Sequence, residues 1–161
     1  MKKLLMILLL PIFILAILTT GKCVAITDGD TIKVLINGKE TKIRLYGIDT
    51  PERGQPFGKA AKQFASNYCY GKEVRLNITG TDRYGRKIAW VYVAGNKSSL
   101  NEELTKAGLA WWYEQYAPKD FNLRDAEKAA KKEKRGLWAS RDAINPKIWR
   151  RMSKEERDLH R

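Results

Sequence analysis

The chain has 161 residues, enough for one domain of ordinary size together with a targeting segment. It carries 31 Lys and Arg against 18 Asp and Glu, a formal net charge of +13, and 43% of its residues are hydrophobic. That apolar content excludes a disordered basic tail, and a folded domain of this charge attracts polyanions, nucleic acid foremost. The single histidine, His160, is next to the last residue, which disfavours hydrolases that depend on a histidine base or a histidine-rich zinc site.

The first residues are typical of an export signal. Lys2 and Lys3 precede an apolar run at 4–18, which is shorter than the roughly 20 residues of a membrane span but suits a signal peptide. We therefore expect residues 1–21 to be a signal peptide, and the protein to be secreted, periplasmic or located at the cell envelope. The alternative is an uncleaved membrane anchor formed by residues 4–18.

The rest of the chain predicts short strands around one helix, followed by two further helices. Residues 31–36 alternate apolar and polar side chains as a half-buried strand does, and Asn37-Gly38 is a strong hairpin signal. Ser99 and Glu102 form a capping box at the start of the second helix. The expected strands are 22–27, 31–36, 41–48, 73–79 and 87–93, and the expected helices are 57–70, 99–108 and 119–135. These elements predict a mainly β fold with α-helices, namely a five-stranded Greek-key barrel of the OB type with three helices.

The predicted barrel domain covers residues 22–138 and is followed by a basic extension, 139–161, that contains Pro146. We expect the extension to pack loosely along the barrel; the alternative is that it enlarges the positive surface for nucleic acid. Cys23 and Cys69 could pair in an oxidising compartment or remain two small buried residues.

Carboxylates occur at two places that a hairpin would bring together. Asp-Gly-Asp-Thr at 28–31 opens one strand, and Asp-Thr-Pro-Glu at 49–52 follows its partner. Because the turn at Asn37-Gly38 makes the strands antiparallel, both groups lie at the same end, where they would repel one another unless a cation neutralised them. Oxygen-only ligands suit Ca²⁺ or Mg²⁺. The alternative is that Asp-Gly only forms a turn and that Asp49 only caps a strand end.

Two arginines lie near these acids in the predicted fold. Arg44 precedes Asp49 by five residues on the same strand, and Arg86 ends the turn at 82–86. A planar guanidinium matches two phosphate oxygens at once, which a lysine does not. For either arginine alone, a solvated strand face would explain the residue equally well.

Three motifs together resemble the staphylococcal nuclease (thermonuclease) family. They are Asp-Gly-Asp-Thr at 28–31, Ile-Arg-Leu-Tyr-Gly-Ile-Asp-Thr-Pro-Glu at 43–52 and Thr-Asp-Arg-Tyr-Gly-Arg at 81–86, in the family's order and spacing. The resemblance covers residues 22–138 and implies a secreted, Ca²⁺-dependent nuclease that hydrolyses phosphodiester bonds of DNA or RNA to 3′-phosphate products. We infer no obligate protein partner and expect a monomer.

The resemblance also implies roles for the acidic residues, position by position. Asp30, Asp49 and the backbone carbonyl of Thr50 fall on the positions that bind Ca²⁺. Glu52 falls on the position of the general base that acts on water.

The two arginines fall on the family's phosphate-binding positions. Arg44 and Arg86 would stabilise the extra negative charge of the transition state. The alternative function is a non-catalytic module that binds nucleic acid with the same barrel. Such a module has little need of all these charged residues together, so the sequence favours the enzyme.

The expected substrate-binding residues are Arg83, Tyr84 and Tyr116. Aromatic residues at 111–116 could stack on unpaired bases, or they could belong to the core. Of the family's two tyrosines after Gly-Leu-Ala, only Tyr116 matches by count, because Glu114 occupies the other position.

Overall fold

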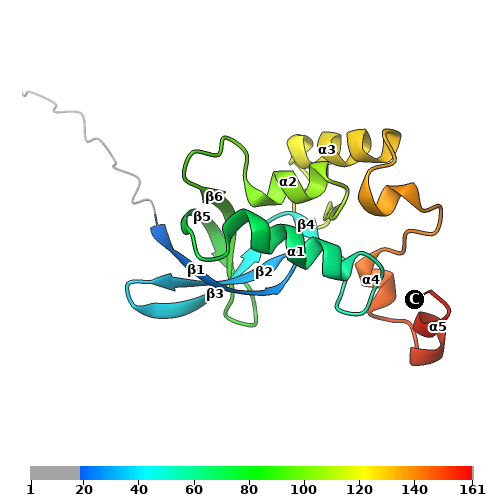
Figure 1. The fold of residues 1–161 in the computed structure, drawn as a ribbon, viewed down its shortest axis with the longest axis horizontal. Coiled ribbons are helices and arrows are strands. Elements are labelled where there is room, and N and C mark those ends of the chain that lie inside the picture. The colour runs from blue at the N-terminus through cyan, green and yellow to red at the C-terminus, as the bar shows by residue number, and fades with distance from the viewer. Residues whose placement is uncertain (1–18, 161) are drawn as a thin grey trace, which may run out of the picture.

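The computed structural model describes residues 19–160, and its centre is a closed barrel of five strands in the order β1-β2-β3-β6-β5 (Figure 1). The strands are β1 (Thr19–Asp28), β2 (Thr31–Ile36), β3 (Lys39–Leu45), β5 (Glu73–Thr81) and β6 (Lys87–Val93). β3 and β6 run parallel, and the other neighbouring pairs run antiparallel. The predicted five-stranded OB barrel is confirmed.

The second hairpin strand is shorter than the sequence predicted. β3 ends at Leu45, and the chain turns at Gly47, whose φ is 71°. A Cβ atom at Gly47 would lie 2.7 Å from Leu123 Cδ1, so glycine suits this position for space as well as for backbone conformation. The next two residues form β4 (Ile48–Asp49), which pairs with β7 (Trp111–Trp112) outside the barrel. The expected continuous strand 41–48 is therefore wrong at its end.

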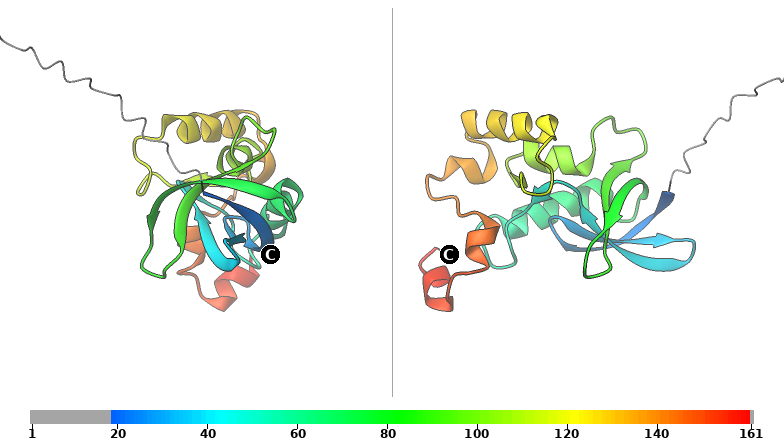
Figure 2. Two further views of the ribbon diagram at one scale, coloured as in Figure 1. Left: turned by 90° about the vertical axis from the view of Figure 1, so that its left-hand side faces the viewer. Right: turned by 180° about the vertical axis from the view of Figure 1, so that it is seen from behind.

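Three substantial helices accompany the barrel, as predicted. They are α1 (Gly58–Cys69), α2 (Leu100–Lys106) and α3 (Phe121–Lys132). α1 packs on β1, whereas α2 packs on β6 and on α3 (Figures 1 and 2). The capping box of α2 is present, because the Ser99 N–H donates to Glu102 Oε2 at 2.8 Å and the Glu102 N–H donates to Ser99 Oγ at 3.1 Å.

The hydrophobic core fills the barrel and continues under the helices. Alternate residues of each strand point inward, as the period of two requires; they include Ile32, Val34, Ile43, Leu45, Ala89 and Val91. The buried Asn101 of α2 ties this helix to the barrel. Its Oδ1 accepts from the Val91 N–H at 3.2 Å, and its Nδ2 donates to the carbonyls of Tyr46 and Ala89 at 2.9 and 3.2 Å.

The predicted signal segment, residues 1–21, lies almost wholly outside the described residues. The first strand begins at Thr19, earlier than the expected Lys22, because Thr19, Thr20 and Gly21 pair with β5. None of the helices within residues 19–160 has the length and apolar character that a membrane crossing requires.

The C-terminal extension folds against the barrel domain instead of packing loosely. The 3₁₀ turn η1 (Gly136–Ala139) leads into it, and it contains two short helices, α4 (Pro146–Trp149) and α5 (Lys154–Asp158). In Figures 1 and 2, α4 lies beside the loop that leads into α1. Trp149 is only 2% exposed, so the extension is anchored by a large apolar side chain.

Candidate active site

The two predicted acidic groups meet around one arginine. Thr31 of β2 pairs with Arg44 of β3, which places the Arg44 side chain beside the start of β2. Arg44 Nη2 lies 3.3 Å from Asp30 Oδ2 and 3.2 Å from Asp49 Oδ1. The hairpin and the turn at Gly47 therefore bring Asp30 and Asp49 within reach of a single guanidinium nitrogen.

Asp30 is a buried carboxylate with a full set of partners. Its Oδ2 accepts from the Thr50 N–H at 2.8 Å and from Thr50 Oγ1 at 3.0 Å, and its Oδ1 accepts from Thr31 Oγ1 at 3.1 Å. Burial alone would raise the pKa of Asp30, but the charge of Arg44 and the hydrogen bonds from Thr50 outweigh burial, and the pKa lies below its ordinary value. Asp30 is thus a permanent negative charge at neutral pH.

Asp49 is also buried, at 4% exposure, and lies between two arginines. Besides Arg44, it contacts Arg150 of the C-terminal extension, whose Nη2 is 2.8 Å from Asp49 Oδ2. Burial raises the pKa of Asp49 above its ordinary value, although the hydrogen bonds of Arg150 and the charge of Arg44 oppose that rise. A divalent cation beside Asp49 would favour its ionised form further.

A third aspartate, Asp28, lies next to Asp30, and the negative charge of Asp30 disfavours ionisation of Asp28. Asp28 Oδ1 accepts from the Asp30 N–H at 3.3 Å. Burial and then the charge of Asp30 raise the pKa of Asp28 to about 7. Asp28 therefore contributes a full negative charge only above neutral pH.

Glu52 lies on a tight loop between β4 and α1. The Gln55 N–H donates to the Glu52 carbonyl at 3.0 Å, and Gln55 Oε1 accepts from the Glu52 N–H at 2.9 Å. Gly58, the first residue of α1, packs so closely that a Cβ atom there would collide with the Glu52 carbonyl oxygen. The Glu52 side chain is half exposed and forms an ion pair with Arg150. The loop thus presents a carboxylate next to the Asp30–Asp49 pair.

Arg86 belongs to the β5–β6 turn, and Asp82 fixes that turn. Asp82 Oδ1 accepts from the N–H groups of Tyr84 and Arg86 at 2.9 and 3.0 Å, and Asp82 Oδ2 lies 2.7 Å from Arg86 Nε. The parallel pairing of Ile43 with Lys87 puts the turn alongside β3, the strand that carries Arg44. Arg86 therefore forms an ion pair with Asp82, which was not predicted from the sequence.

The residues expected to bind substrate occupy two exposed surfaces. Tyr84 is 68% exposed at the tip of the β5–β6 turn, and Arg83 Nη2 donates to its hydroxyl at 2.6 Å. Tyr116 is 63% exposed and packs edge-on against Tyr113, with ring centroids 4.7 Å apart. Trp111 is only 8% exposed, so the core explanation holds for this aromatic residue.

A groove runs beside Asp49 between the β7 segment and the extension. Its volume is about 230 Å³, and its lining consists of Asp49, Trp111, Trp112, Tyr113, Glu114, Gln115, Asn145 and Lys147. Aromatic faces, amides and one lysine next to a carboxylate suit a nucleotide better than an apolar ligand.

The oxygen atoms at the site fit a hard divalent cation. Asp30 and Asp49 supply carboxylates, and Thr50, the residue directly after Asp49, adds a backbone carbonyl. Within residues 19–160, no group of three Asp, Glu, His or Cys side chains converges into a metal-binding cluster. Two carboxylates and a carbonyl leave coordination positions for water or substrate oxygens, which Ca²⁺ and Mg²⁺ accept readily. Soft metals have no thiolate or imidazole ligand here.

Arg150 is the residue at this site that the sequence did not single out. It follows Asp49 by 101 positions and Glu52 by 98 in the chain. Its hydrogen bonds, first to Asp49 and then to Glu52, raise its already high pKa. No local pattern could indicate the contact, because it depends on how the extension folds back.

Comparison with known proteins agrees with the resemblance, and the family match includes the motifs at 43–52 and 81–86. Residues 42–140 match the sequence model of a family described as "Staphylococcal nuclease homologue". A protein named "Uncharacterized endonuclease" of Haemophilus influenzae is 43% identical over 84% of this chain and 75% of its own length. The "Micrococcal nuclease" of Shigella flexneri is 39% identical over 83% and 82%, and the "Thermonuclease" of Staphylococcus hyicus is 36% identical over 75% and 76%. The chain belongs to the staphylococcal nuclease family.

Proposed function

We propose that the protein is a Ca²⁺-dependent nuclease that hydrolyses phosphodiester bonds of DNA, RNA or both to 3′-phosphate products. The observation that carries the proposal is the convergence of Asp30 and Asp49 on Arg44, with the Glu52 carboxylate beside them. The names of the nuclease relatives support the same reaction class.

Asp30, Asp49 and the carbonyl of Thr50 would bind the Ca²⁺ ion. Asp30 suits this task because the hydrogen bonds from Thr50 fix its orientation and its lowered pKa keeps it ionised. When bound, Ca²⁺ withdraws negative charge from the phosphodiester and neutralises the carboxylates.

Glu52 would hold the attacking water and accept its proton as the water oxygen bonds to phosphorus. The bond from phosphorus to the 5′ oxygen then breaks, which leaves the phosphate on the 3′ side. Arg44 reaches the site from β3 and would donate hydrogen bonds to the phosphate oxygens in the transition state. Arg86 would donate hydrogen bonds to the same oxygens or to the departing 5′ oxygen. For this, its guanidinium must either use its other N–H groups or break the ion pair with Asp82.

The nucleic-acid strand would be bound by the exposed residues around this centre. Arg83 would contact a phosphate, and the rings of Tyr84 and Tyr116 would stack on bases. Stacking on exposed rings tolerates every base, so we expect weak sequence preference. Without Lys2 and Lys3 of the signal segment the net charge of +13 becomes +11, which would still make binding strongly dependent on salt.

We also propose that the protein is exported by its N-terminal segment and acts outside the cytoplasm, as a monomer. The export part of this proposal has its support in the sequence of residues 1–21 alone. N-terminal sequencing of the protein recovered from cell fractions and medium tests it. A mature chain that begins near Thr19 to Lys22 supports export with cleavage, and an intact Met1 would favour the anchor.

The nuclease proposal is tested by incubating the purified protein with single- and double-stranded DNA and with RNA, in Ca²⁺ or in a chelator. We expect cleavage only with Ca²⁺, with 3′-phosphate ends on the products. Glu52→Gln should lower the rate by about 10²–10⁴. Cleavage that persists in chelator would refute the role of the metal, and full activity of Glu52→Gln would refute the base.

A further inference from the structure

One cation from the C-terminal extension contacts both carboxylates that would carry the chemistry. Arg150 Nη2 lies 2.8 Å from Asp49 Oδ2, Nη1 lies 3.3 Å from Asp49 Oδ1, and Nη1 also pairs with Glu52 Oε1. Arg150 thus binds Asp49 through both carboxylate oxygens and links it to Glu52. A guanidinium is the side chain that suits such a link, because it presents several N–H donors in one plane.

The Glu52 loop is tied to the extension at a second point. Gln55 is buried, with 6% exposure, and its two polar atoms face different segments. Its Oε1 accepts from the Glu52 N–H at 2.9 Å, whereas its Nε2 donates to the Ile144 carbonyl at 2.6 Å. The backbone of Glu52 is therefore held through Gln55, and its carboxylate is held by Arg150.

The extension that carries Arg150 is itself fixed. Trp149 is 2% exposed, and Asn145 caps α4 by accepting from the Lys147 N–H at 2.9 Å. Arg157 of α5 donates to the carbonyls of Trp149 and Arg150 at 3.0 and 3.2 Å. These contacts hold the backbone from which the Arg150 side chain extends to the acids.

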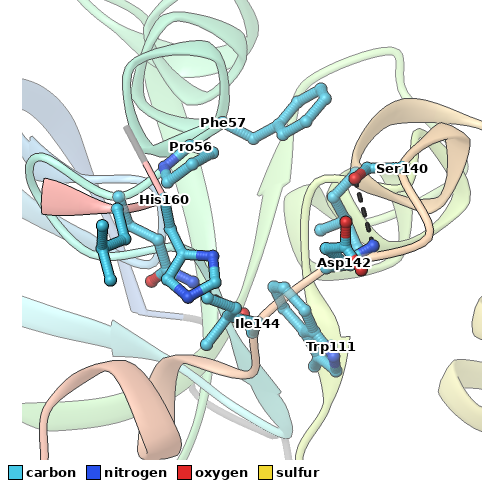
Figure 3. Close-up of a pocket in the computed structure, with 11 residues that line it drawn as sticks. Pro56, Phe57, Trp111, Ser140, Asp142, Ile144 and His160 are labelled. Carbon is cyan, nitrogen blue, oxygen red and sulfur yellow. Dashed lines mark hydrogen bonds between the residues drawn. The ribbon is translucent and has the colours of Figure 1, made fainter. Parts of the chain in front are cut away.

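A pocket of about 300 Å³ lies between the two segments (Figure 3). Pro56 and Phe57 line it from the loop before α1, and Asp142 and Ile144 line it from the extension. Loop and extension are thus joined at the hydrogen bond of Gln55 and at the ion pairs of Arg150, with open space beside these contacts. Without Arg150, the Glu52 loop would keep the hydrogen bond of Gln55 to the Ile144 carbonyl of the extension.

We propose that Arg150 is a positioning residue of the nuclease site, which orients the carboxylates of Glu52 and Asp49 and makes the C-terminal extension part of the catalytic unit. The proposal rests on the nuclease function proposed above. Asp49 Oδ1 accepts from both Arg44 and Arg150, whereas Oδ2 accepts from Arg150 alone. A carboxylate oxygen has two lone pairs, so the second lone pair of Oδ2 is not occupied by either arginine. The proposal requires a cation to bind Asp49 on its remaining side while Arg150 stays on Glu52.

The test compares Arg150→Ala and Arg150→Lys with wild type in steady-state cleavage of one DNA substrate with Ca²⁺. We expect Arg150→Ala to lower kcat by about 10–100-fold, with a much smaller change in KM. Arg150→Lys should recover part of the loss, because an ammonium can bind one carboxylate but cannot span both. The control is Arg151→Ala, which removes the same charge from the neighbouring exposed position.

A double-mutant cycle separates positioning from other roles of Arg150. If Arg150 acts through Glu52, Arg150→Ala should cost less than about threefold when Glu52 is already Gln. Full additivity of the two substitutions would overturn the proposal, because it would assign Arg150 to the phosphate or to the fold. Equal decreases of kcat in Arg151→Ala and Arg150→Ala would also overturn it, because the loss of one positive charge near the site would then explain both.

Calorimetric titration of the substrate-free proteins with Ca²⁺ adds a readout that does not depend on turnover. We expect the Kd of Arg150→Ala for Ca²⁺ to lie within about threefold of the wild-type Kd or to be higher. Binding that becomes ten times tighter, together with unchanged or faster cleavage, would show that Arg150 merely competes with the cation. If wild type cleaves and Glu52→Gln does not, full activity of Arg150→Ala refutes only this proposal. Absence of cleavage by wild type refutes the nuclease function itself.

Discussion

Cys23 and Cys69 face each other in the core, with their Sγ atoms 3.6 Å apart and both side chains fully buried. The backbones beside them are already joined, because the Gly71 N–H donates to the Cys23 carbonyl at 2.8 Å and the Cys23 N–H donates to the Lys72 carbonyl at 2.9 Å. The hydrogen bond from the Cys69 thiol lowers the pKa of Cys23 below its ordinary value. The pair is therefore placed for a disulfide that needs only a small movement.

We predict that refolding in oxidised glutathione joins Cys23 to Cys69, with both thiol hydrogens transferred to the glutathione. The bridge closes a loop of 46 residues, and restriction of the unfolded chain should raise the free energy of unfolding by about 4 kcal/mol. Mass spectrometry of the intact chain and urea unfolding with and without reductant measure the two effects. The Cys23→Ser, Cys69→Ser double variant is the control. Two free thiols after oxidising refolding would contradict the prediction.

Removal of Arg44 should destabilise the protein chiefly when no metal is present. Arg44→Ala leaves the buried Asp30 and Asp49 without the guanidinium they share, which should cost about 3 kcal/mol in chelator. Ca²⁺ should restore part of that loss, because it supplies positive charge to the same carboxylates. Thermal and urea unfolding in chelator and in Ca²⁺ measure the difference. Lys33→Ala breaks an exposed ion pair with Glu40 on the same hairpin and should cost less than about 1 kcal/mol in both conditions.

Local patterns predicted much of the fold and the acidic part of the site. The Asn37-Gly38 turn has φ values of 48° and 79°, as the hairpin signal implied, so the strands pair as expected and the two groups of acids meet. The capping box of Ser99 and Glu102 also follows from side-chain chemistry within one turn. Each of these features depends on residues only a few positions apart, which is why the sequence could indicate them.

Features that depend on distant contacts were not predicted. After β3, Leu123 leaves no room for a Cβ atom at Gly47, although the two residues are 76 positions apart in the chain. Arg150 reaches Asp49 across 101 positions, from an extension that was expected only to pack loosely along the barrel. Basic residues are numerous here, so neither charge nor composition distinguishes Arg150 from Arg151.

Asn101 should be a principal polar contribution to stability. Asn101→Ala would leave the buried Val91 N–H without its side-chain acceptor and would remove the donor to the carbonyls of Tyr46 and Ala89. We expect the free energy of unfolding to fall by about 2–4 kcal/mol, because unsatisfied buried groups keep their desolvation cost and a cavity is added. Urea unfolding measures it, with the exposed Asn77→Ala as control, expected within about 0.5 kcal/mol of wild type. A loss of Asn101→Ala no larger than that of the control would contradict this reading of the contacts.

Asp28 should make the metal-free protein less stable as the pH rises towards 7. Its pKa is about 7 in the folded chain, against 3.8 for an ordinary aspartate, so the unfolded chain loses this proton first. Between those values the folded state binds more protons, and its stability therefore falls with increasing pH. Asp28→Asn removes the effect.

We therefore expect Asp28→Asn, in chelator, to be more stable than wild type at pH 8 by an amount on the order of 2 kcal/mol, and to differ little at pH 4. Urea unfolding at the two pH values measures the change. Asp142→Asn, at an exposed position, is the control and should show no such dependence. If the gain of Asp28→Asn were the same at both pH values, packing and not the proton would explain it, and the pKa of Asp28 could not be raised by its burial and by the charge of Asp30.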